Sequence, residues 1–382
     1  MTNPSVLPLF EMLAAAQACR ASDVHLTANH RPLVRVDGDL VEIPGYFEPT
    51  TANWLDATLG GLLTNDQIAE FRENGEVDLS ITVPNVARFR VNVFRQLGNV
   101  AVALRFIPDR IKSFSELGVP QVAAELVMKP RGLVLVTGPT GSGKSTTLAS
   151  MIDIVNQTTP AHIVTVEDPV EFQHTSKRAL IHQREIGSDT ASFAEALRRV
   201  LRQDPDIILI GELRDPESIS TALTAAETGH LVMSTLHTQS AAKSINRIVD
   251  AFPSDQQNQV RTQLGDTLRG VITQTLLPRA QNEGRVIATE VLVNTPAIAN
   301  LIREGEISQI YSMMQAGGAI GMHTLDQDLK RLVESGTISL AAAKEIAEDP
   351  RTFDEARVRP VDYDAEAWTM HASERTGTGW RN

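Results

Sequence analysis

The sequence predicts an α/β protein with a doubly wound parallel sheet, preceded by a smaller α+β domain. Two observations lead to this fold class. From Gly132 onward, short apolar segments alternate with helical patterns, and strands that alternate with helices form parallel sheets. Before residue 110, apolar and polar residues alternate between turn signals, which is typical of an antiparallel sheet. A chain of 382 residues is also long enough for two domains.

Residues 1–110 are expected to form the small α+β domain. Apolar residues recur at helical spacing in "LPLFEMLAAAQAC", which predicts a helix. The segment "PLVRVDGDLVEIP" predicts a β-hairpin that turns at Asp37 and Gly38. Three further strands are predicted between Glu76 and Pro108. The charged segment after them is bounded by prolines, and we interpret residues 111–120 as a linker.

Residues 121–360 are expected to form the larger domain. Its strands are predicted at "LVLVT", "HIVTVED", "DIILIGE" and "HLVMSTLHT", and helices at "SFAEALRRVLRQ" and "ESISTALTAAETG". After Ser254 the pattern becomes mainly helical. One long amphipathic helix is predicted from the apolar residues Val260, Leu264, Leu268, Val271 and Ile272. Residues 361–382 are polar and are interpreted as a flexible tail.

Composition excludes several classes of protein. The formal net charge is −12, and a strongly acidic chain is a poor general binder of nucleic acid. Cys19 is the single cysteine, so neither an intrachain disulfide nor a multi-cysteine zinc site can form, and we expect a small buried side chain there. The N-terminus lacks the pattern of a signal peptide, and no apolar run approaches about 18 residues. The sequence therefore predicts a cytoplasmic protein without membrane insertion.

A glycine-rich loop, "GPTGSGKSTT", predicts a nucleotide site. Gly138, Gly143, Lys144 and Ser145 meet the pattern G-x-x-x-x-G-K-[ST] between a predicted strand and a predicted helix. Backbone N–H groups of such a loop surround phosphate, the lysine reaches the β- and γ-phosphates, and the serine binds Mg²⁺. ATP and Mg²⁺ are therefore the expected cofactors, with Ser145 as the metal ligand. The candidate binding residues are Gly138, Pro139, Thr140, Gly141, Ser142, Gly143, Lys144, Ser145 and Thr146.

Reactive side chains follow the other predicted core strands: Glu167 and Asp168, then Glu212, then His237. A carboxylate on the strand next to a P-loop strand can position or deprotonate water. Gly211 stands where an aspartate is usual, so Glu212 must act largely alone or with Glu167. Other interpretations stay open. A strand-end acid can be a helix cap, Asp168 can serve only a turn, and a lone histidine is often structural.

Four motifs in order now resemble a known family. "GPTGSGKSTT", "VTVEDPVEF", "ILIGELRD" and "TGHLVMSTLHT" resemble the Walker A, Asp-box, Walker B and His-box motifs of the secretion-type traffic ATPases. "ASDVHL" and "ARFRVNVFRQ" are similar to their N-terminal domain. "TPAIANLIREGEISQIYSMMQAGGAIGMHTLDQDL" resembles the C-terminal region of the PilT-type pilus retraction ATPases. The resemblance covers residues 7–355 and implies a RecA-like core with a PAS-like N-terminal domain.

The resemblance also implies roles for individual residues. Glu212 would be the general base, Glu167 an additional catalytic carboxylate, and His237 a sensor of the γ-phosphate. Arg90 and Arg105 match the arginines that the N-terminal domain brings to the nucleotide. Arg88 lies on the same strand face as Arg90, but no family role is matched to it.

As a whole, the resemblance implies a hexameric ring that hydrolyses ATP and powers type IV pilus retraction, and thus twitching motility. The ring would be peripheral at the inner membrane, against a platform protein of the pilus machinery. The absence of a four-cysteine zinc motif favours retraction over a type II secretion-like assembly ATPase.

Two departures leave alternatives open. Ala299 stands where the retraction family usually has arginine. The chain past residue 355 is longer than in short members, as in PilU-type accessory ATPases, so PilT-type and PilU-type remain alternatives, and a paralogous retraction ATPase is a further candidate partner. A nucleotide-dependent binding module without turnover is disfavoured by Glu212, Glu167 and the two arginines Arg90 and Arg105. A DNA translocase is disfavoured by the net acidity.

Overall fold

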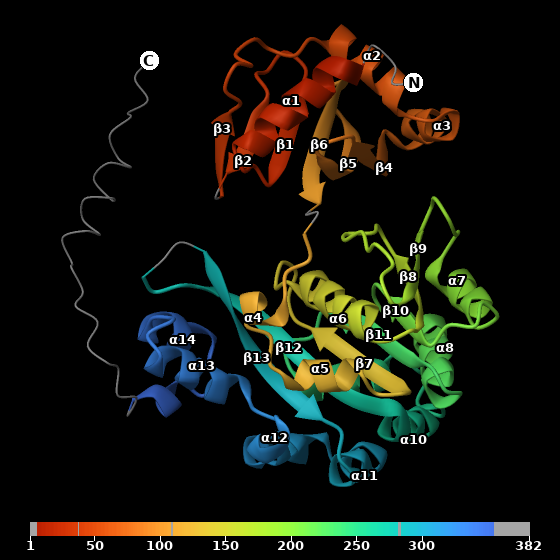
Figure 1. Ribbon diagram of the computed structural model, residues 1–382, viewed down its shortest axis with the longest axis vertical. Helices are drawn as coiled ribbons and strands as arrows, with labels where there is room; N and C mark the ends of the chain where they lie inside the picture. The colour runs from red at the N-terminus through yellow and green to blue at the C-terminus, as the bar shows by residue number, and fades with distance from the viewer. Residues whose placement is uncertain (1–5, 37, 108–109, 282–283, 355–382) are drawn as a thin grey trace.

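The computed structural model describes residues 6–36, 38–107, 110–281 and 284–354. These residues form two bodies, each built on its own sheet, as Figure 1 shows. The predicted tail at 361–382, Asp37 of the predicted turn and residues 108–109 of the proline-bounded segment lie outside the described residues. The predicted α/β fold class, with a central parallel sheet and a smaller α+β body before it, is confirmed.

The N-terminal body is an antiparallel sheet of six strands in the order β3-β2-β1-β6-β5-β4. The strands are β1 (Asp23–Thr27), β2 (Leu33–Val36), β3 (Asp39–Glu42), β4 (Glu76–Val83), β5 (Ala87–Gln96) and β6 (Asn99–Ile107). The helices are α1 (Leu7–Ala18), α2 (Ala52–Leu62) and α3 (Asn65–Asn74). Phe89, Val91 and Val93 alternate along β5 and are 0% exposed, so that face forms the core. The intervening side chains of β5, including Arg88 and Arg90, therefore lie on the opposite face.

The C-terminal body has a sheet of seven strands in the order β13-β12-β7-β11-β10-β8-β9. Every pairing is parallel except that of β12 with β13. The strands are β7 (Gly132–Thr137), β8 (His162–Glu167), β9 (Leu180–Glu185), β10 (Ile207–Ile210), β11 (Leu231–Leu236), β12 (Leu268–Pro278) and β13 (Arg285–Val293).

Helices cover both faces of this sheet, and the side chains of β7 show how. Leu133 and Leu135 contribute to the cluster that includes α7–α10, whereas Val134 and Val136 contribute to the cluster that includes α5 and α6. The helices are α4 (Phe114–Leu117), α5 (Val122–Val127), α6 (Lys144–Thr158), α7 (Phe193–Val200), α8 (Pro216–Glu227), α9 (Ala241–Asp250), α10 (Gln257–Thr267), α11 (Pro296–Glu304), α12 (Ile310–Ala316), α13 (Leu325–Glu334) and α14 (Leu340–Ile346). None of the described helices is long and apolar enough to cross a bilayer.

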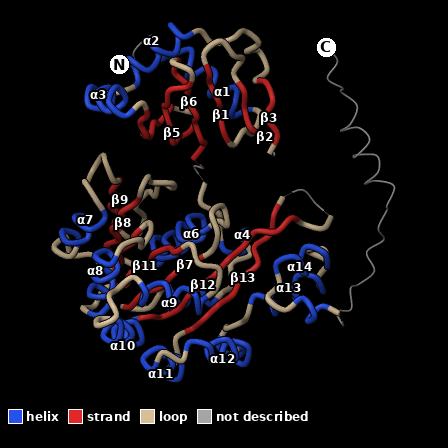
Figure 2. The backbone as a smooth tube through the Cα atoms, turned by 180° about the vertical axis from the view of Figure 1, so that it is seen from behind, coloured by secondary structure: helices blue, strands red, loops and turns tan. Residues whose placement is uncertain are grey.

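The prediction of one long helix through Val260 and Ile272 is wrong. The helix α10 ends at Thr267, and the next eleven residues form β12, which lies beside β13 in Figure 2. The segment "GVITQTLL" is largely buried on both strand faces because both faces of the sheet are covered, and such a run cannot be distinguished from a buried helix by periodicity. The region after Ser254 is therefore not mainly helical up to Val293. The edge strand β9 was also not predicted.

Candidate nucleotide-binding site

The predicted P-loop joins the end of β7 to the start of α6. Gly138 has a φ of 139°, and a Cβ there would lie 2.2 Å from the carbonyl oxygen of Gln274. Only glycine can occupy this position without displacing β12. Gly143, with a φ of 87°, is the N-cap of α6. The free N–H groups of the first turn of α6 and the positive end of its dipole therefore lie at the loop, an arrangement that binds phosphate.

Lys144 is held within the loop itself. Its Nζ donates to the carbonyl oxygens of Gly138 at 2.9 Å and Pro139 at 3.1 Å. Burial lowers the pKa of Lys144, and the nearby carboxylates of Glu212 and Glu171 oppose that shift. A phosphate at the loop would give this ammonium a charged acceptor in place of neutral carbonyls.

A buried glutamine fastens the P-loop to β12. Gln274 is 1% exposed, and its Nε2 donates to the carbonyl oxygen of Ser142 at 2.7 Å. Its Oε1 accepts from the hydroxyl of Thr147 at 2.9 Å. One side chain, not predicted from the sequence, thus holds the C-terminal end of the loop and the first turn of α6. The available signal was the glutamine in "GVITQTLL", where the polar residues Thr273, Gln274 and Thr275 lie between apolar ones, because buried polar groups need partners.

The predicted strand-end residues meet at the carboxyl edge of the seven-stranded sheet, where parallel α/β sheets bind ligands. Glu167, Glu212 and His237 line one cavity of about 710 Å³ together with Lys144 and Ser145. The expectation that Glu212 sits on the strand next to the P-loop strand is wrong, because β11 lies between β7 and β10. The order of strands depends on crossovers, which a single sequence does not display.

Glu212 is held by two basic side chains. Its Oε2 lies 2.8 Å from Nη2 of Arg214, and its Oε1 lies 3.3 Å from Nε2 of His237. Burial raises the pKa of Glu212, but the hydrogen bond and charge of Arg214 and the contact with His237 outweigh it, so the net shift is downward. The carboxylate is therefore ionised and can accept a proton.

Glu167 has the opposite electrostatic environment. It is partly buried at the end of β8 and accepts from Thr165 Oγ1 at 2.6 Å and from Gln183 Nε2 at 3.3 Å. Burial outweighs both hydrogen bonds and raises the pKa of Glu167 to about 6. Two carboxylates in one cavity with pKa values shifted in opposite directions are typical of sites that move protons.

The N-terminal body contributes arginines to the same cavity. Arg90 and Arg105 face each other across β5 and β6, and both line the cavity with Phe106 and Ile107. The Nε of Arg105 donates to Asp23 Oδ1 at 2.7 Å, although Arg105 itself is 71% exposed. Asp23 thus orients the guanidinium of Arg105, a function that the motif "ASDVHL" alone did not indicate.

Three of the predicted binding residues do not line the cavity: Gly138, Pro139 and Ser142 shape the loop from behind. Thr140, Gly141, Gly143 and Thr146 do line it. Arg285, at the start of β13, was missed because a helix was expected in that region. The lining residues that were not assigned to the site are Asp168, Pro169, Glu171, Phe172, Phe193, Gly211, Arg214, Thr235, Leu276, Arg285 and the pair Phe106 and Ile107.

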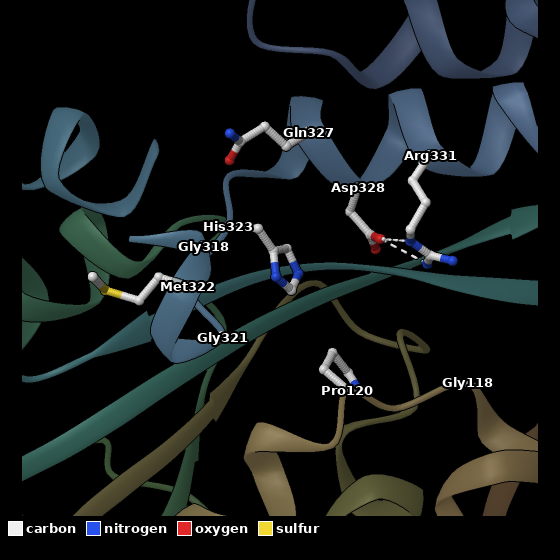
Figure 3. A pocket seen from close by; sticks show the side chains of 9 residues that line it. All are labelled: Gly118, Pro120, Gly318, Gly321, Met322, His323, Gln327, Asp328 and Arg331. Atoms are coloured by element: carbon white, nitrogen blue, oxygen red, sulfur yellow. Dashed lines mark hydrogen bonds and ion pairs between the residues drawn. The ribbon is translucent and has the colours of Figure 1, made fainter. Parts of the chain in front are cut away.

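A second cavity, of about 450 Å³, lies between Pro120 and the segment that leads into α13 (Figure 3). Its polar side chains are already paired with protein groups. His323 Nε2 lies 2.9 Å from the hydroxyl of Thr289, and Asp328 accepts from Arg331 Nε at 2.7 Å. Burial lowers the pKa of His323. This cavity has none of the P-loop residues, so the candidate site for nucleotide is the larger one.

Comparisons with known proteins show which family the chain belongs to. The sequence profile of the family described as "Type II/IV secretion system protein" matches residues 4–352. The chain is 50% identical to the type IV pilus retraction ATPase PilT of Pseudomonas aeruginosa over 347 residues, which covers 91% of this chain and 100% of that protein. Its identity to the type IV pilus ATPase PilU of the same organism is 39% over 318 residues, covering 83% of each chain.

The fold is similar to a crystal structure of the pilus retraction motor PilT with bound ADP. The TM-score is 0.84 and the sequence identity 47%, and the match covers 90% of this chain and 98% of that one. The resemblance inferred from the four ordered motifs is thereby confirmed. The chain belongs to the type II/IV secretion system protein family and, within it, to the PilT-type pilus retraction ATPases.

Proposed function

We propose that this chain hydrolyses ATP with Mg²⁺ and uses the energy to retract a type IV pilus. The observation that carries the proposal is the composition of the 710 Å³ cavity. It combines a P-loop lysine, two acidic strand ends and two arginines from the other body. Each of these groups has a distinct task in phosphoryl transfer, whereas a module that only binds nucleotide needs no second carboxylate.

The residues present fit both ATP and Mg²⁺. The loop surrounds phosphate with N–H groups, and the Ser145 hydroxyl at the start of α6 offers Mg²⁺ the oxygen ligand that it prefers. When bound, Mg²⁺ neutralises charge on the β- and γ-phosphates. Glu212, ionised, accepts the proton of the attacking water. Arg90 and Arg105 stabilise the negative charge of the transferring group from the opposite wall.

The remaining catalytic assignments follow the same geometry. His237, which directly follows β11, contacts the carboxylate of Glu212 and is proposed to sense the γ-phosphate. Glu167 is proposed as an additional carboxylate that positions water.

We propose a homohexameric ring as the working assembly, in the cytoplasm and peripheral at the inner membrane. The ring would act on the platform protein of the pilus machinery, and a paralogous retraction ATPase is a further candidate partner. Within the retraction class, the 50% identity to PilT against 39% to PilU favours the PilT-type role. The accessory role is the second candidate.

A deletion strain tests the proposal. We expect cells without this protein to keep surface pili but to lose retraction and twitching, and wild-type protein to restore both. A strain complemented with Glu212→Gln should express the protein without restoring retraction. Loss of surface pili in the deletion strain would indicate an assembly motor instead, and full retraction by the Glu212→Gln strain would show that hydrolysis at this site is not the source of force.

A further inference from the structure

One ion pair joins the two bodies close to the nucleotide cavity. Arg88 on β5 donates through Nη2 to Oε2 of Glu185, the last residue of β9, at 2.5 Å. The side chains are 16% and 9% exposed, so the pair is largely removed from water. Ser80 on β4 completes the contact, since its hydroxyl accepts from Arg88 at 2.7 Å and donates to Glu185 Oε1 at 2.8 Å. The sequence indicated no role for Arg88 beside Arg90, but the structure places Arg88 in a contact between the two bodies.

Glu185 is also tied to the segment that carries Glu167. In the ladder of β8 with β9, Glu185 is the direct partner of Glu167. Its Oε2 accepts the backbone N–H of Val170 at 3.0 Å, and Val170 lies just beyond the turn that follows Glu167. On the same strand, Gln183 donates to the Glu167 carboxylate. The Glu185 carboxylate thus accepts hydrogen bonds both from the N-terminal body, through Arg88, and from the backbone of Val170 near the candidate catalytic residue Glu167.

We propose that Arg88 and Glu185 form a positioning pair that couples docking of the N-terminal body to the Glu167 segment, a proposal that rests on the ATP hydrolysis proposed above. When β5 is docked, Arg88 anchors it to β9, and Arg90, on the same face of the same strand, is thereby placed at the cavity. The same contact holds the Glu185 carboxylate under the Val170 N–H. When β5 withdraws, the Glu185 carboxylate loses its cation and the Ser80 hydroxyl, and the contact that fixes it beneath the Val170 N–H is released.

The physical consequence is a split between binding and turnover. The P-loop, Lys144 and Gln274 belong wholly to the C-terminal body, so the groups that hold the phosphates stay in place without Arg88 and nucleotide affinity should change little. Arg90 of β5 and Glu167 of β8 are proposed to act during hydrolysis, so the rate of turnover should depend on the contact that Arg88 makes.

Purified protein tests this with steady-state kinetics and binding of fluorescent ADP. We expect Arg88→Ala to lower kcat at least tenfold, with KM for ATP and ADP affinity within about twofold of wild type. Arg88→Lys, which keeps the charge, should recover part of kcat. Glu185→Gln, which removes the charge but keeps one acceptor oxygen for the Val170 N–H, should also lower kcat, and Arg88→Ala combined with Glu185→Gln should be no worse than the more severe single variant. Arg31→Ala is the matched control, since Arg31 pairs with Glu42 on the surface of the same body, and it should leave kcat unchanged.

Each contrary result has a distinct meaning. The coupling is refuted if Arg88→Ala behaves like Arg31→Ala, if the two single losses multiply in the double variant, or if KM rises while kcat is kept. Ser80→Ala removes only a bridging hydroxyl, and it should give a smaller kcat loss in the same direction even if Arg88→Ala is too unstable to assay. Wild-type protein without turnover would instead overturn the proposed function.

Discussion

Gln274 and Ser142 are 132 residues apart in the sequence, yet the side-chain amide of Gln274 donates to the backbone carbonyl of Ser142 at 2.7 Å inside the protein. This bond makes β12 part of the nucleotide site, although none of the four sequence motifs lies on that strand. The shape of the P-loop is thus maintained by a neighbouring strand as well as by its own glycines.

Replacing Gln274 should loosen the loop before any nucleotide binds. In Gln274→Leu, the Ser142 carbonyl and the Thr147 hydroxyl lose their buried partner, and each unsatisfied group costs about 1–3 kcal/mol. We expect a lower Tm and weaker ADP binding, measured by thermal melting and titration. Gln203→Leu, at an exposed glutamine after α7, is the control and should change neither. Unchanged ADP affinity in Gln274→Leu would show that the loop holds its shape alone.

Binding and hydrolysis should separate at the P-loop and at β10. Lys144→Ala removes the cation of the loop and should abolish tight ATP binding, whereas Glu212→Gln should bind ATP and lose turnover, because the loop and Ser145 remain. Paired binding and turnover assays check both, with Glu73→Gln on the exposed surface of α3 as the control for loss of a carboxylate. Hydrolysis by Glu212→Gln at a rate near wild type would contradict the general-base assignment.

The arginines of the N-terminal body should act on rate and not on affinity. Arginines that stabilise a transferring phosphoryl group are worth about 10³–10⁵ in rate, so Arg90→Ala and Arg105→Ala should each lower kcat severely with little change in ADP binding. Asp23→Asn should lower kcat less, because Arg105 keeps its charge but loses its ionic partner. Arg95→Ala, on the same strand but above the ring of Phe71, is the control. Equal, mild losses in all four variants would mean that no arginine acts on the nucleotide.

The raised pKa of Glu167 predicts a pH effect with a definite sign. A carboxyl with a pKa of about 6 in the folded protein is largely protonated below that pH and ionised above it. If its ionised form positions water, kcat/KM should rise as pH increases through about 6, and the limb should be absent in Glu167→Gln. The measurement is kcat/KM against pH for wild type and for Glu167→Gln. Comparing the two profiles removes the effect of ATP ionisation, which is the same in both. Identical profiles would exclude Glu167 from the rate.

Ionisation of Glu167 should lower the stability of the fold over the same pH range in which it raises kcat/KM. Because the folded-state pKa is raised above the ordinary value of 4.5, the folded protein binds more protons than the unfolded chain between about 4.5 and 6. This carboxyl therefore favours folding most at low pH, and its contribution is lost as pH rises through 6. The pH at which turnover increases is thus the pH at which this group ceases to stabilise the fold.

The sequence predicted those parts of the site that lie within one segment. The loop from Gly138 to Thr146 and the carboxylates at the ends of β8 and β10 could be found because a strand, a turn and a reactive side chain are adjacent in the chain. What was missed depends on pairing between distant segments. The order of strands, the Gln274 brace and the contact of Arg88 with Glu185 have no local pattern, and β12 was interpreted as helix because burial on both faces hides the period of a strand.

The position of β12 determines how far a shortened fragment of the nucleotide-binding body must extend along the chain. A fragment that stops at the end of α10, at Thr267, would contain all four motifs and still lack the strand that pairs with the outer side of β7. It would expose an apolar strand edge, the kind of surface through which proteins aggregate, and the hydroxyl of Thr137 would lose its partner Thr273. A shortened chain intended for crystallisation or ligand screening should therefore extend through β13 to Val293, so that the sheet keeps both of the strands that close this edge.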